Sequence, residues 1–307
     1  MRRRRLDANV NTPESSAIRR IDEILPARET IEGAGVHLRR AFGNREVPRL
    51  DPFLLLDDFR SENPAEYLPG FPWHPHRGME TVTYMLDGFV EHEDSIGNHG
   101  VVGKGDVQWM TSGSGIIHQE MPKPREGAMG GFQLWVNLPS SDKMMTPRYQ
   151  EVKRASIPEV QPAKGVTVRV VSGTIGGVHG PVRDIVVEPE YLDVQLSPHA
   201  VLEHPLERGH TVLAYVLQGK GRFDEESGEV VDSESLVLFQ DGDIVRIEAH
   251  ADPLRFLLIS GRPIREPVAW WGPIVMNTRR ELEVAIEEYQ DGTFIKHRAP
   301  SAPSGGR

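Results

Sequence analysis

The chain has no cysteine among its 307 residues. Disulfide bonds and thiolate metal sites are therefore excluded. No stretch approaches the ~18 consecutive apolar residues that a membrane-spanning helix needs, so we expect no membrane partner. No apolar segment follows the first arginines, which argues against an export signal and makes the cytoplasm the expected location.

Basic residues are in the minority, since 35 Lys and Arg face 45 Asp and Glu, giving a formal net charge of −10. A nucleic-acid-binding surface needs clustered Lys and Arg to contact phosphates, so this balance argues against direct binding of nucleic acid. The basic run from Arg2 to Arg5 is the exception, and we interpret it as part of a solvated tail over residues 1–16. Residues 293–307 end in a Pro-, Ser- and Gly-rich run and form the second expected tail.

The sequence is rich in turn-forming residues, with 24 prolines and 30 glycines. Between them lie short segments of β-branched and aromatic residues, a pattern typical of an all-β sandwich or barrel. We expect strands at residues 81–86, 89–93, 107–111, 132–138, 166–171, 185–188, 192–196, 211–217, 236–239, 244–248 and 254–259.

The two halves of the chain resemble each other. Residues 80–88, Glu-Thr-Val-Thr-Tyr-Met-Leu-Asp-Gly, are similar to residues 210–219, and residues 103–109 are similar to residues 240–246. This repeat predicts two related β-barrels in tandem, formed by residues 17–150 and 151–277. We expect the connection between them near residues 149–160, where prolines interrupt any strand.

One helix is predicted, over residues 278–292. Thr278 and Glu281 have the spacing of a capping box, in which the two side chains bond free amides of the first turn. One apolar face follows, made of Leu282, Ala285, Ile286 and Tyr289. We expect this helix to pack across a barrel.

Two pairs of possible metal ligands stand out, His74-Pro75-His76 and His118-Gln119-Glu120. Residues i and i+2 of a strand point to the same face, so two such pairs on facing strands would surround one point with three imidazoles and a carboxylate. That ligand set suits a divalent iron, nickel, copper, manganese or zinc ion. A single His-x-His pair is more often a surface or turn feature. The second half has His204-Pro205-Leu206 and nothing like the second pair, so only the first half is equipped for metal.

The other candidate residues carry weaker signals. His92 and His99 lie near the ligand segments but match no ligand position, and surface or turn roles are expected for both. His204 and His210 are minor candidates for a metal in the second half. Aromatic and sulfur-containing side chains that could line a ligand pocket, or simply pack in the core, are Trp73, Trp109, Trp135, Phe132 and Met110.

Residues 71–84 and 105–122, which contain both ligand pairs, resemble the pirin family of the cupin superfamily, and residues 261–278 resemble its C-terminal signature. The resemblance implies two tandem cupin barrels with a C-terminal helix, and one metal ion, usually iron, in the N-terminal barrel only. It also implies the ligands His74, His76, His118 and Glu120. In cupins at large the carboxylate lies four residues after the second histidine, where this chain has Glu80. The pirin pattern favours Glu120, and Glu80 is the alternative.

The resemblance also implies a function. Several pirin-family proteins are similar to quercetin 2,3-dioxygenases, so we expect a metal-dependent oxidoreductase that cleaves a flavonol with dioxygen and releases carbon monoxide. Glu120 would act as general base on the flavonol hydroxyl. Fe(II) is the expected ion, with nickel, manganese, copper and zinc as alternatives. Other pirin relatives are transcriptional co-regulators, so the alternative is a metal- or redox-responsive regulator that binds a protein partner.

Overall fold

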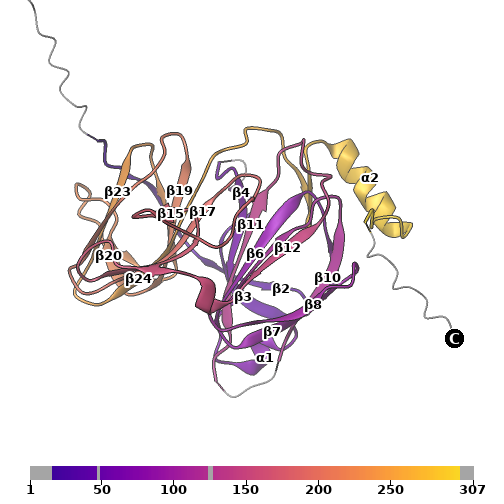
Figure 1. Cartoon of the computed structure of the whole chain (residues 1–307), viewed down its shortest axis with the longest axis horizontal. Coiled ribbons are helices and arrows are strands. Elements are labelled where there is room, and N and C mark those ends of the chain that lie inside the picture. The colour runs from indigo at the N-terminus through magenta and orange to yellow at the C-terminus, as the bar shows by residue number, and fades with distance from the viewer. Residues whose placement is uncertain (1–15, 47–48, 124–126, 298–307) are drawn as a thin grey trace, which may run out of the picture.

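The computed structural model describes residues 16–46, 49–123 and 127–297. Most of these residues form strands, arranged as two barrels side by side, which confirms the expected all-β double-barrel fold (Figure 1). Each barrel is built from a seven-stranded and a four-stranded sheet. Apart from Ser16 and residues 293–297, the two expected tails lie outside the described residues.

The first barrel pairs a sheet of order β12-β9-β6-β11-β4-β3-β2 with a sheet of order β5-β10-β7-β8. A short helix, α1 (Pro64–Tyr67), precedes β5. The strands of the larger sheet are β2 (Arg28–Glu32), β3 (Val36–Phe42), β4 (Phe53–Asp58), β6 (Met79–Asp87), β9 (Val107–Thr111), β11 (Gly130–Asn137) and β12 (Arg148–Val152). Those of the smaller sheet are β5 (Phe71–His76), β7 (Phe89–Asp94), β8 (His99–Gly103) and β10 (Ile116–Pro122).

The second barrel repeats this plan with the orders β1-β22-β19-β24-β17-β14-β13 and β18-β23-β20-β21. Its larger sheet contains β1 (Ile21–Pro26), β13 (Glu159–Val160), β14 (Val166–Ser172), β17 (Glu190–Leu196), β19 (Thr211–Gln218), β22 (Ser235–Phe239) and β24 (Leu254–Gly261). Its smaller sheet contains β18 (Val201–Pro205), β20 (Lys220–Arg222), β21 (Val231–Asp232) and β23 (Ile244–Ala249). The short strands β15 (Thr174–Ile175) and β16 (Val178–His179) form a separate hairpin, and a 3₁₀ turn spans Arg154–Ser156.

The strand expected at residues 185–188 is wrong, because this segment forms a turn before β17. Its ends explain the difference. Asp184 has a φ of 55° and Glu188 a φ of 44°. Both values lie in the left-handed region, which a β-strand does not accommodate.

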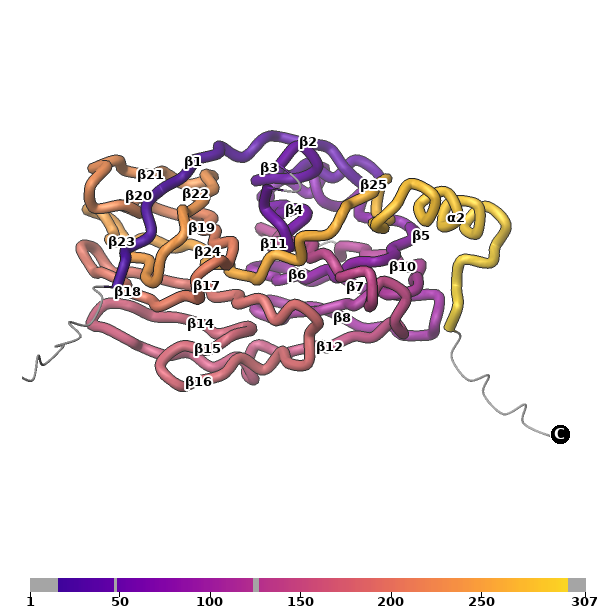
Figure 2. The backbone as a smooth tube through the Cα atoms, turned by 90° about the horizontal axis from the view of Figure 1, so that it is seen from above, coloured from indigo at the N-terminus to yellow at the C-terminus, as the bar shows by residue number. Residues whose placement is uncertain are grey.

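Segments from the two ends of the chain cross between the barrels. Although we expected residues 17–150 to form the first barrel, β1 pairs antiparallel with β22 of the second. In return, the hairpin of β25 (Ala269–Trp271) and β26 (Ile274–Met276) lies against the first barrel, as Figure 2 shows beside β5 and β10. It is held there by a parallel bridge between Arg77 and Ile274 and by a 3.0 Å hydrogen bond from the Val275 amide to the Arg77 carbonyl. Neither barrel is therefore complete without a segment from the other half of the sequence.

The helix α2 (Arg279–Gln290) begins with the predicted capping box, because the Thr278 amide donates to Glu281 Oε2 at 2.8 Å and the Glu281 amide donates to Thr278 Oγ1 at 3.2 Å. Ala285 is fully buried in a cluster with Ile274, Met276 and Phe294, against which Ile117 of β10 also packs. The helix thus packs against the β25–β26 hairpin, on the side of the first barrel that contains β10.

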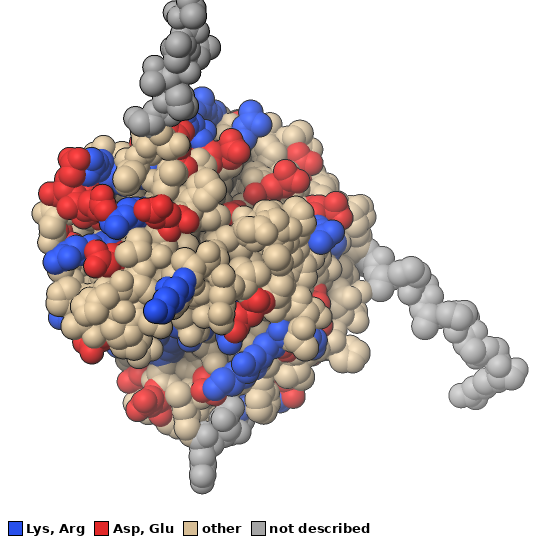
Figure 3. Space-filling model, turned by 60° about the vertical axis from the view of Figure 1, so that its left-hand side comes forward, with Lys and Arg blue, Asp and Glu red and all other residues tan. Residues whose placement is uncertain are grey.

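Charged side chains of both signs are interspersed on the face shown in Figure 3, which displays no broad basic area. None of the helices in the described part of the chain is long and apolar enough to cross a membrane. The cytoplasmic location stays a prediction.

Candidate metal centre

The two histidine-containing segments are neighbouring strands. β5 and β10 pair antiparallel, and His118 lies directly opposite His74. The first pair lies in a strand of its own, β5, in a different sheet from the β6 strand that follows it. Because β5 is the edge strand of that sheet, Pro75 removes no hydrogen bond that a further strand would need.

The imidazoles of His74, His76 and His118 converge, and their candidate ligand atoms lie within 4.8 Å of one another. The Nε2 atom of His74 is 3.0 Å from Nε2 of His76 and 3.0 Å from Nε2 of His118. His74 Nδ1 lies 2.8 Å from the carbonyl oxygen of Pro72, which can only accept, so Nδ1 carries the proton and Nε2 holds a lone pair. That one lone pair cannot accept an N–H from both neighbours, whereas a cation at the centre would satisfy all three nitrogens. The arrangement therefore fits a metal ion.

Burial prepares these imidazoles for ligation. His76 and His118 are each 1% exposed. Burial, and secondarily the positive charge that neighbouring histidines would carry, lowers the pKa of both well below the ordinary value. Both rings are consequently neutral near pH 7, with lone pairs available. His74 is only partly buried and forms the side of the group that opens to the surface.

Glu120 does not join the group of three histidines. Its carboxylate accepts a 3.2 Å hydrogen bond from Thr83 Oγ1 and a 3.0 Å hydrogen bond from Gln133 Nε2. Gln133 Oε1 in turn accepts a 2.9 Å hydrogen bond from the indole N–H of Trp135. Sequence reasoning missed Gln133, although a glutamine at an inward position of a buried strand was a signal that it has a polar partner inside the barrel.

Glu80, the alternative carboxylate, faces away from Glu120. Side chains alternate along a strand, so Glu80 and Thr83 of β6 lie on opposite faces, and Thr83 is the one that contacts Glu120. Glu80 is buried and accepts a 2.7 Å hydrogen bond from Thr111 Oγ1. Burial raises the pKa of this carboxyl group.

The other histidines of the first barrel lie outside the group. His92 is buried rather than at the surface, and its Nε2 lies 2.7 Å from Glu151 Oε1. Its ring stacks on Tyr149 with centroids 5.9 Å apart. His99 is exposed at the start of β8. Within the described residues, no other set of His, Asp and Glu side chains meets the same test for a metal site.

The second barrel has apolar residues where the first has ligands. His204 of β18 lies opposite Val245 of β23, as His74 lies opposite His118. Two residues further on, Leu206 replaces His76 and Ile247 replaces Glu120, and Val245 and Ile247 belong to the apolar core of the second barrel. His204 instead pairs with Glu190 at 2.8 Å. His204 and His210, the minor candidates in this half, are not part of any metal-type group among the described residues.

A cleft of about 580 Å³ opens beside His74. Its lining includes Trp73, His74, Gln133, Trp135 and Trp270. The Trp135 ring meets the His76 ring edge to face, with centroids 5.4 Å apart. Two of the expected pocket aromatics, Trp109 and Phe132, pack instead in the apolar layer between the barrels. The cleft therefore offers an aromatic surface directly beside the candidate metal position.

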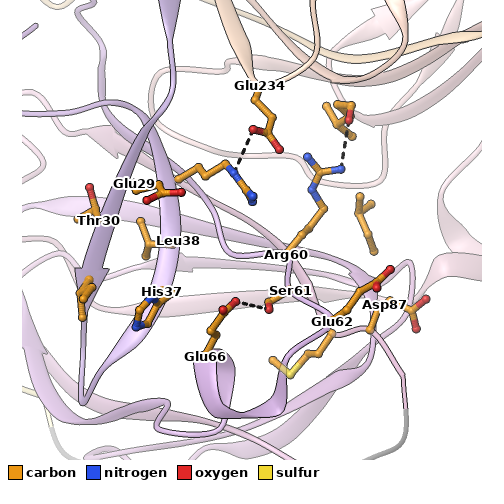
Figure 4. A pocket seen from close by; sticks show the side chains of 17 residues that line it. Glu29, Thr30, His37, Leu38, Arg60, Ser61, Glu62, Glu66, Asp87 and Glu234 are labelled. Carbon is orange, nitrogen blue, oxygen red and sulfur yellow. Dashed lines mark hydrogen bonds and ion pairs between the residues drawn. The ribbon is translucent and has the colours of Figure 1, made fainter.

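A larger cavity of about 890 Å³ lies elsewhere, at the junction of the two barrels (Figure 4). Carboxylates crowd its lining, and two of them are occupied by neighbours: Glu66 accepts from Ser61 at 2.6 Å, and Glu234 pairs with Arg39 at 3.1 Å. None of the three converging histidines lines it. This cavity is larger than the cleft beside His74, but the candidate metal ligand lines the smaller cleft, which we therefore take as the candidate site.

Comparison with known proteins agrees with these features. The pirin family model matches residues 35–136, and the model described as the pirin C-terminal cupin domain matches residues 191–295. A pirin-like protein of Caulobacter vibrioides is 46% identical over 278 residues, covering 90% of this chain and 99% of that protein. Human pirin is 43% identical over 270 residues, covering 86% of this chain and 90% of that protein. The crystal structure of a quercetin 2,3-dioxygenase from Acinetobacter baumannii has a TM-score of 0.84 at 30% identity, covering 91% of this chain and 99% of that one.

Proposed function

The chain belongs to the pirin family of cupins, and we propose from this premise that it is a metal-dependent dioxygenase acting on a flavonol such as quercetin. The observation that carries the proposal is the convergence of three imidazoles beside an aromatic cleft. The reaction adds both atoms of dioxygen to the flavonol, opens its heterocyclic ring and releases one carbon as carbon monoxide.

We assign His74, His76 and His118 as the residues that would hold the ion. Glu120 lies outside their group and would have to turn toward them to become the fourth ligand. Nitrogen and oxygen donors of this kind accept Fe(II), which we propose as the native ion, and also nickel, manganese, copper or zinc. When bound, the ion supplies a Lewis-acidic centre for the substrate hydroxyl and for dioxygen.

Glu120 also serves as the base that takes the proton of the flavonol 3-hydroxyl. Both of its oxygens are engaged, by Thr83 and by Gln133, so accepting that proton requires the carboxylate to turn away from at least one donor. Trp135 packs against His76 and keeps water from that side of the imidazole group. Only the dioxygenase function needs Glu120 as a base; a regulatory function would need it solely as a ligand.

Turnover tests the reaction. We expect protein loaded with Fe(II), under air, to consume oxygen, deplete quercetin and release carbon monoxide. If iron-, nickel- and manganese-loaded forms all leave quercetin intact, the dioxygenase proposal is wrong, and a metal-responsive regulator that binds a protein partner becomes the better account.

Metal content tests the ligands separately from turnover. We expect His76→Ala to lose bound metal, whereas His92→Ala, which removes a buried histidine outside the group, keeps it. A His76→Ala variant with full metal content would overturn the assignment. For the carboxylate, Glu120→Gln should abolish turnover and Glu80→Gln should not, because Glu80 faces the other side of its strand.

A further inference from the structure

We propose that the cleft beside His74 selects a planar aromatic ligand that carries hydroxyl groups able to donate hydrogen bonds, and that Trp270 and Glu32 make this selection. The inference rests on the proposed function, because it names the recognition residues of the same site. It concerns binding, however, and is tested without turnover.

Trp270 forms an aromatic wall that the C-terminal half contributes to the first barrel. It lies on β25, and its ring centroid is 6.1 Å from that of Trp135. Its indole N–H donates to the carbonyl oxygen of Gly272 at 2.5 Å, which fixes the ring within the hairpin. The hairpin itself is held by Lys143, whose Nζ donates to the Val275 carbonyl at 3.0 Å. A planar ring entering the cleft would thus meet a rigid aromatic face.

Trp73 adds a second aromatic residue to the same lining. It precedes His74 in β5 and is 47% exposed, although large apolar side chains are usually buried. Trp73 and Trp270 come from the two halves of the chain and line one opening. This accounts for an exposed tryptophan next to a ligand histidine, and it favours an aromatic ligand over an aliphatic one.

The cleft lining also has a polar part, Glu32, Arg40 and Asp57, which carries a net negative charge. Arg40 donates two hydrogen bonds to Asp57, at 2.8 Å and 2.8 Å, and forms a 3.0 Å ion pair with Glu32. One guanidinium is thus shared by two carboxylates. Asp57 is 9% exposed and Glu32 is 42% exposed at the side chain, so Glu32 is the carboxylate that a ligand can reach.

This charge balance determines which polar groups the cleft can accept on a ligand. A ligand carboxylate or phosphate would meet an excess negative charge and be repelled, because Arg40 is already neutralised. A hydroxyl group would instead donate a hydrogen bond to the Glu32 carboxylate. The cleft is therefore matched to an uncharged polyphenol, oriented with a hydroxyl group toward Glu32.

Calorimetric titration under anaerobic conditions, with the full metal-loaded chain, provides the test. The probes are quercetin, a flavonol without hydroxyls on its pendant ring, and a flavonol with a carboxylate there. We expect wild-type protein to bind quercetin at least ~10-fold more tightly than either analogue, a difference of about 1.4 kcal/mol. Trp270→Ala should weaken all three, and Glu32→Gln should reduce the preference for quercetin over the unhydroxylated probe, because an amide oxygen is a weaker acceptor than a carboxylate.

Two neighbouring residues provide matched controls. Trp271→Ala removes the next tryptophan of the hairpin, which is 56% exposed and does not line the cleft. Glu29→Gln changes another carboxylate of β2, which lines the other cavity. Both should bind the probes as wild type does. Trp270→Leu keeps an apolar side chain in the hairpin and tests the aromatic face if Trp270→Ala unfolds it.

The outcomes separate this inference from the proposed function. If quercetin is turned over but Trp270→Leu and Glu32→Gln bind all probes as wild type does, the inference is wrong and the dioxygenase proposal stands. If the expected selectivity is found without any turnover, the recognition residues are right and the dioxygenase proposal fails. Equal or tighter binding of the carboxylate probe would overturn the charge argument.

Discussion

The hydroxyl of Tyr84 in the first barrel donates a 2.7 Å hydrogen bond to Asp193 Oδ2 in the second. The reciprocal contact is also present, because the hydroxyl of Tyr215 donates to Asp58 Oδ2 at 3.0 Å. Tyr84 stands four residues before Gly88, and Tyr215 stands four residues before Gly219, so the repeated segments supply the same side chain to both contacts. All four partners are buried, which makes the boundary between the barrels both apolar and specifically hydrogen-bonded.

Removing one of these hydroxyls should destabilise the protein without disturbing the metal. Tyr84→Phe leaves Asp193 bonded to Arg255, at 2.9 Å and 2.7 Å, so we expect a loss of about 1–2 kcal/mol in the free energy of unfolding. Urea titration measures this loss, and metal content should be unchanged. Tyr289→Phe is the control, because Tyr289 of α2 is 39% exposed. If Tyr84→Phe is as stable as wild type, the Tyr84–Asp193 hydrogen bond makes no net contribution to the free energy of unfolding.

The repeat is also why much of the fold could be predicted from the sequence. Residues 80–88 and 210–219 form the corresponding strands β6 and β19, and alternating β-branched residues identify most central strands. The exchange of end segments could not be predicted. β1 and the β25–β26 hairpin are short, and nothing in their local pattern says which sheet edge they join. That choice depends on contacts far away in the sequence, such as the Arg77–Ile274 bridge.

The candidate site likewise has some features that the sequence predicts and others that it does not. The convergence of His74, His76 and His118 could be predicted from the sequence. Residues i and i+2 of a strand point to the same face, and pairing of the two ligand strands brings the third histidine to that face. The position of the Glu120 carboxylate was not, because it depends on Gln133, a residue from another sheet. Trp270 was missed as a cleft residue for the same reason, since only the crossing of the hairpin brings it to the histidines.

Gln133 should contribute to metal binding because its hydrogen bond orients the Glu120 carboxylate. We expect Gln133→Leu to weaken metal affinity about 10-fold, within the range found when the partner of a ligand is removed. The substitution also leaves the Trp135 indole N–H without its acceptor. Competition with a chelator measures the affinity.

Gln119→Leu is the matched control, since Gln119 lies between His118 and Glu120 but bonds Glu93 on the outer face. Unchanged affinity in Gln133→Leu would mean that Glu120 takes its metal-binding position without this hydrogen bond.

Lys143 should make the stability depend on pH above neutrality. Burial lowers its pKa from 10.5 to about 8. Between these values the unfolded chain binds more protons than the folded chain, so the free energy of unfolding should rise with pH. The full effect is on the order of 3 kcal/mol, at about 1.4 kcal/mol per pKa unit.

Comparison with Lys143→Met isolates this contribution. Lys143 donates to the Gly78 carbonyl, Asn137 Oδ1 and the Val275 carbonyl, so the variant should be less stable at every pH. The difference between wild type and variant should widen as the pH rises from 8 to 10.5, as measured by urea unfolding. A constant difference would show that Lys143 keeps its ordinary pKa in the folded state.

Arg77 should couple the C-terminal helix to the metal strands. It follows His76, and its Nε donates to the Ser114 carbonyl, in the turn before His118, at 2.7 Å. Its other nitrogens bond Glu288 of α2 at 2.7 Å and the Phe294 carbonyl at 2.8 Å. A lysine cannot reach three acceptors with one planar fork. We therefore expect Arg77→Lys to lower the free energy of unfolding by about 2 kcal/mol.

The same substitution should weaken metal binding about 10-fold, because it loosens the spacing between the β5 and β10 histidines. Chelator competition measures the affinity and urea unfolding the stability. Arg279→Lys, which changes an arginine of α2 that is 92% exposed, should alter neither. If Arg77→Lys loses stability but binds metal as tightly as wild type, Arg77 anchors the helix without influencing the metal centre, and the two properties are independent.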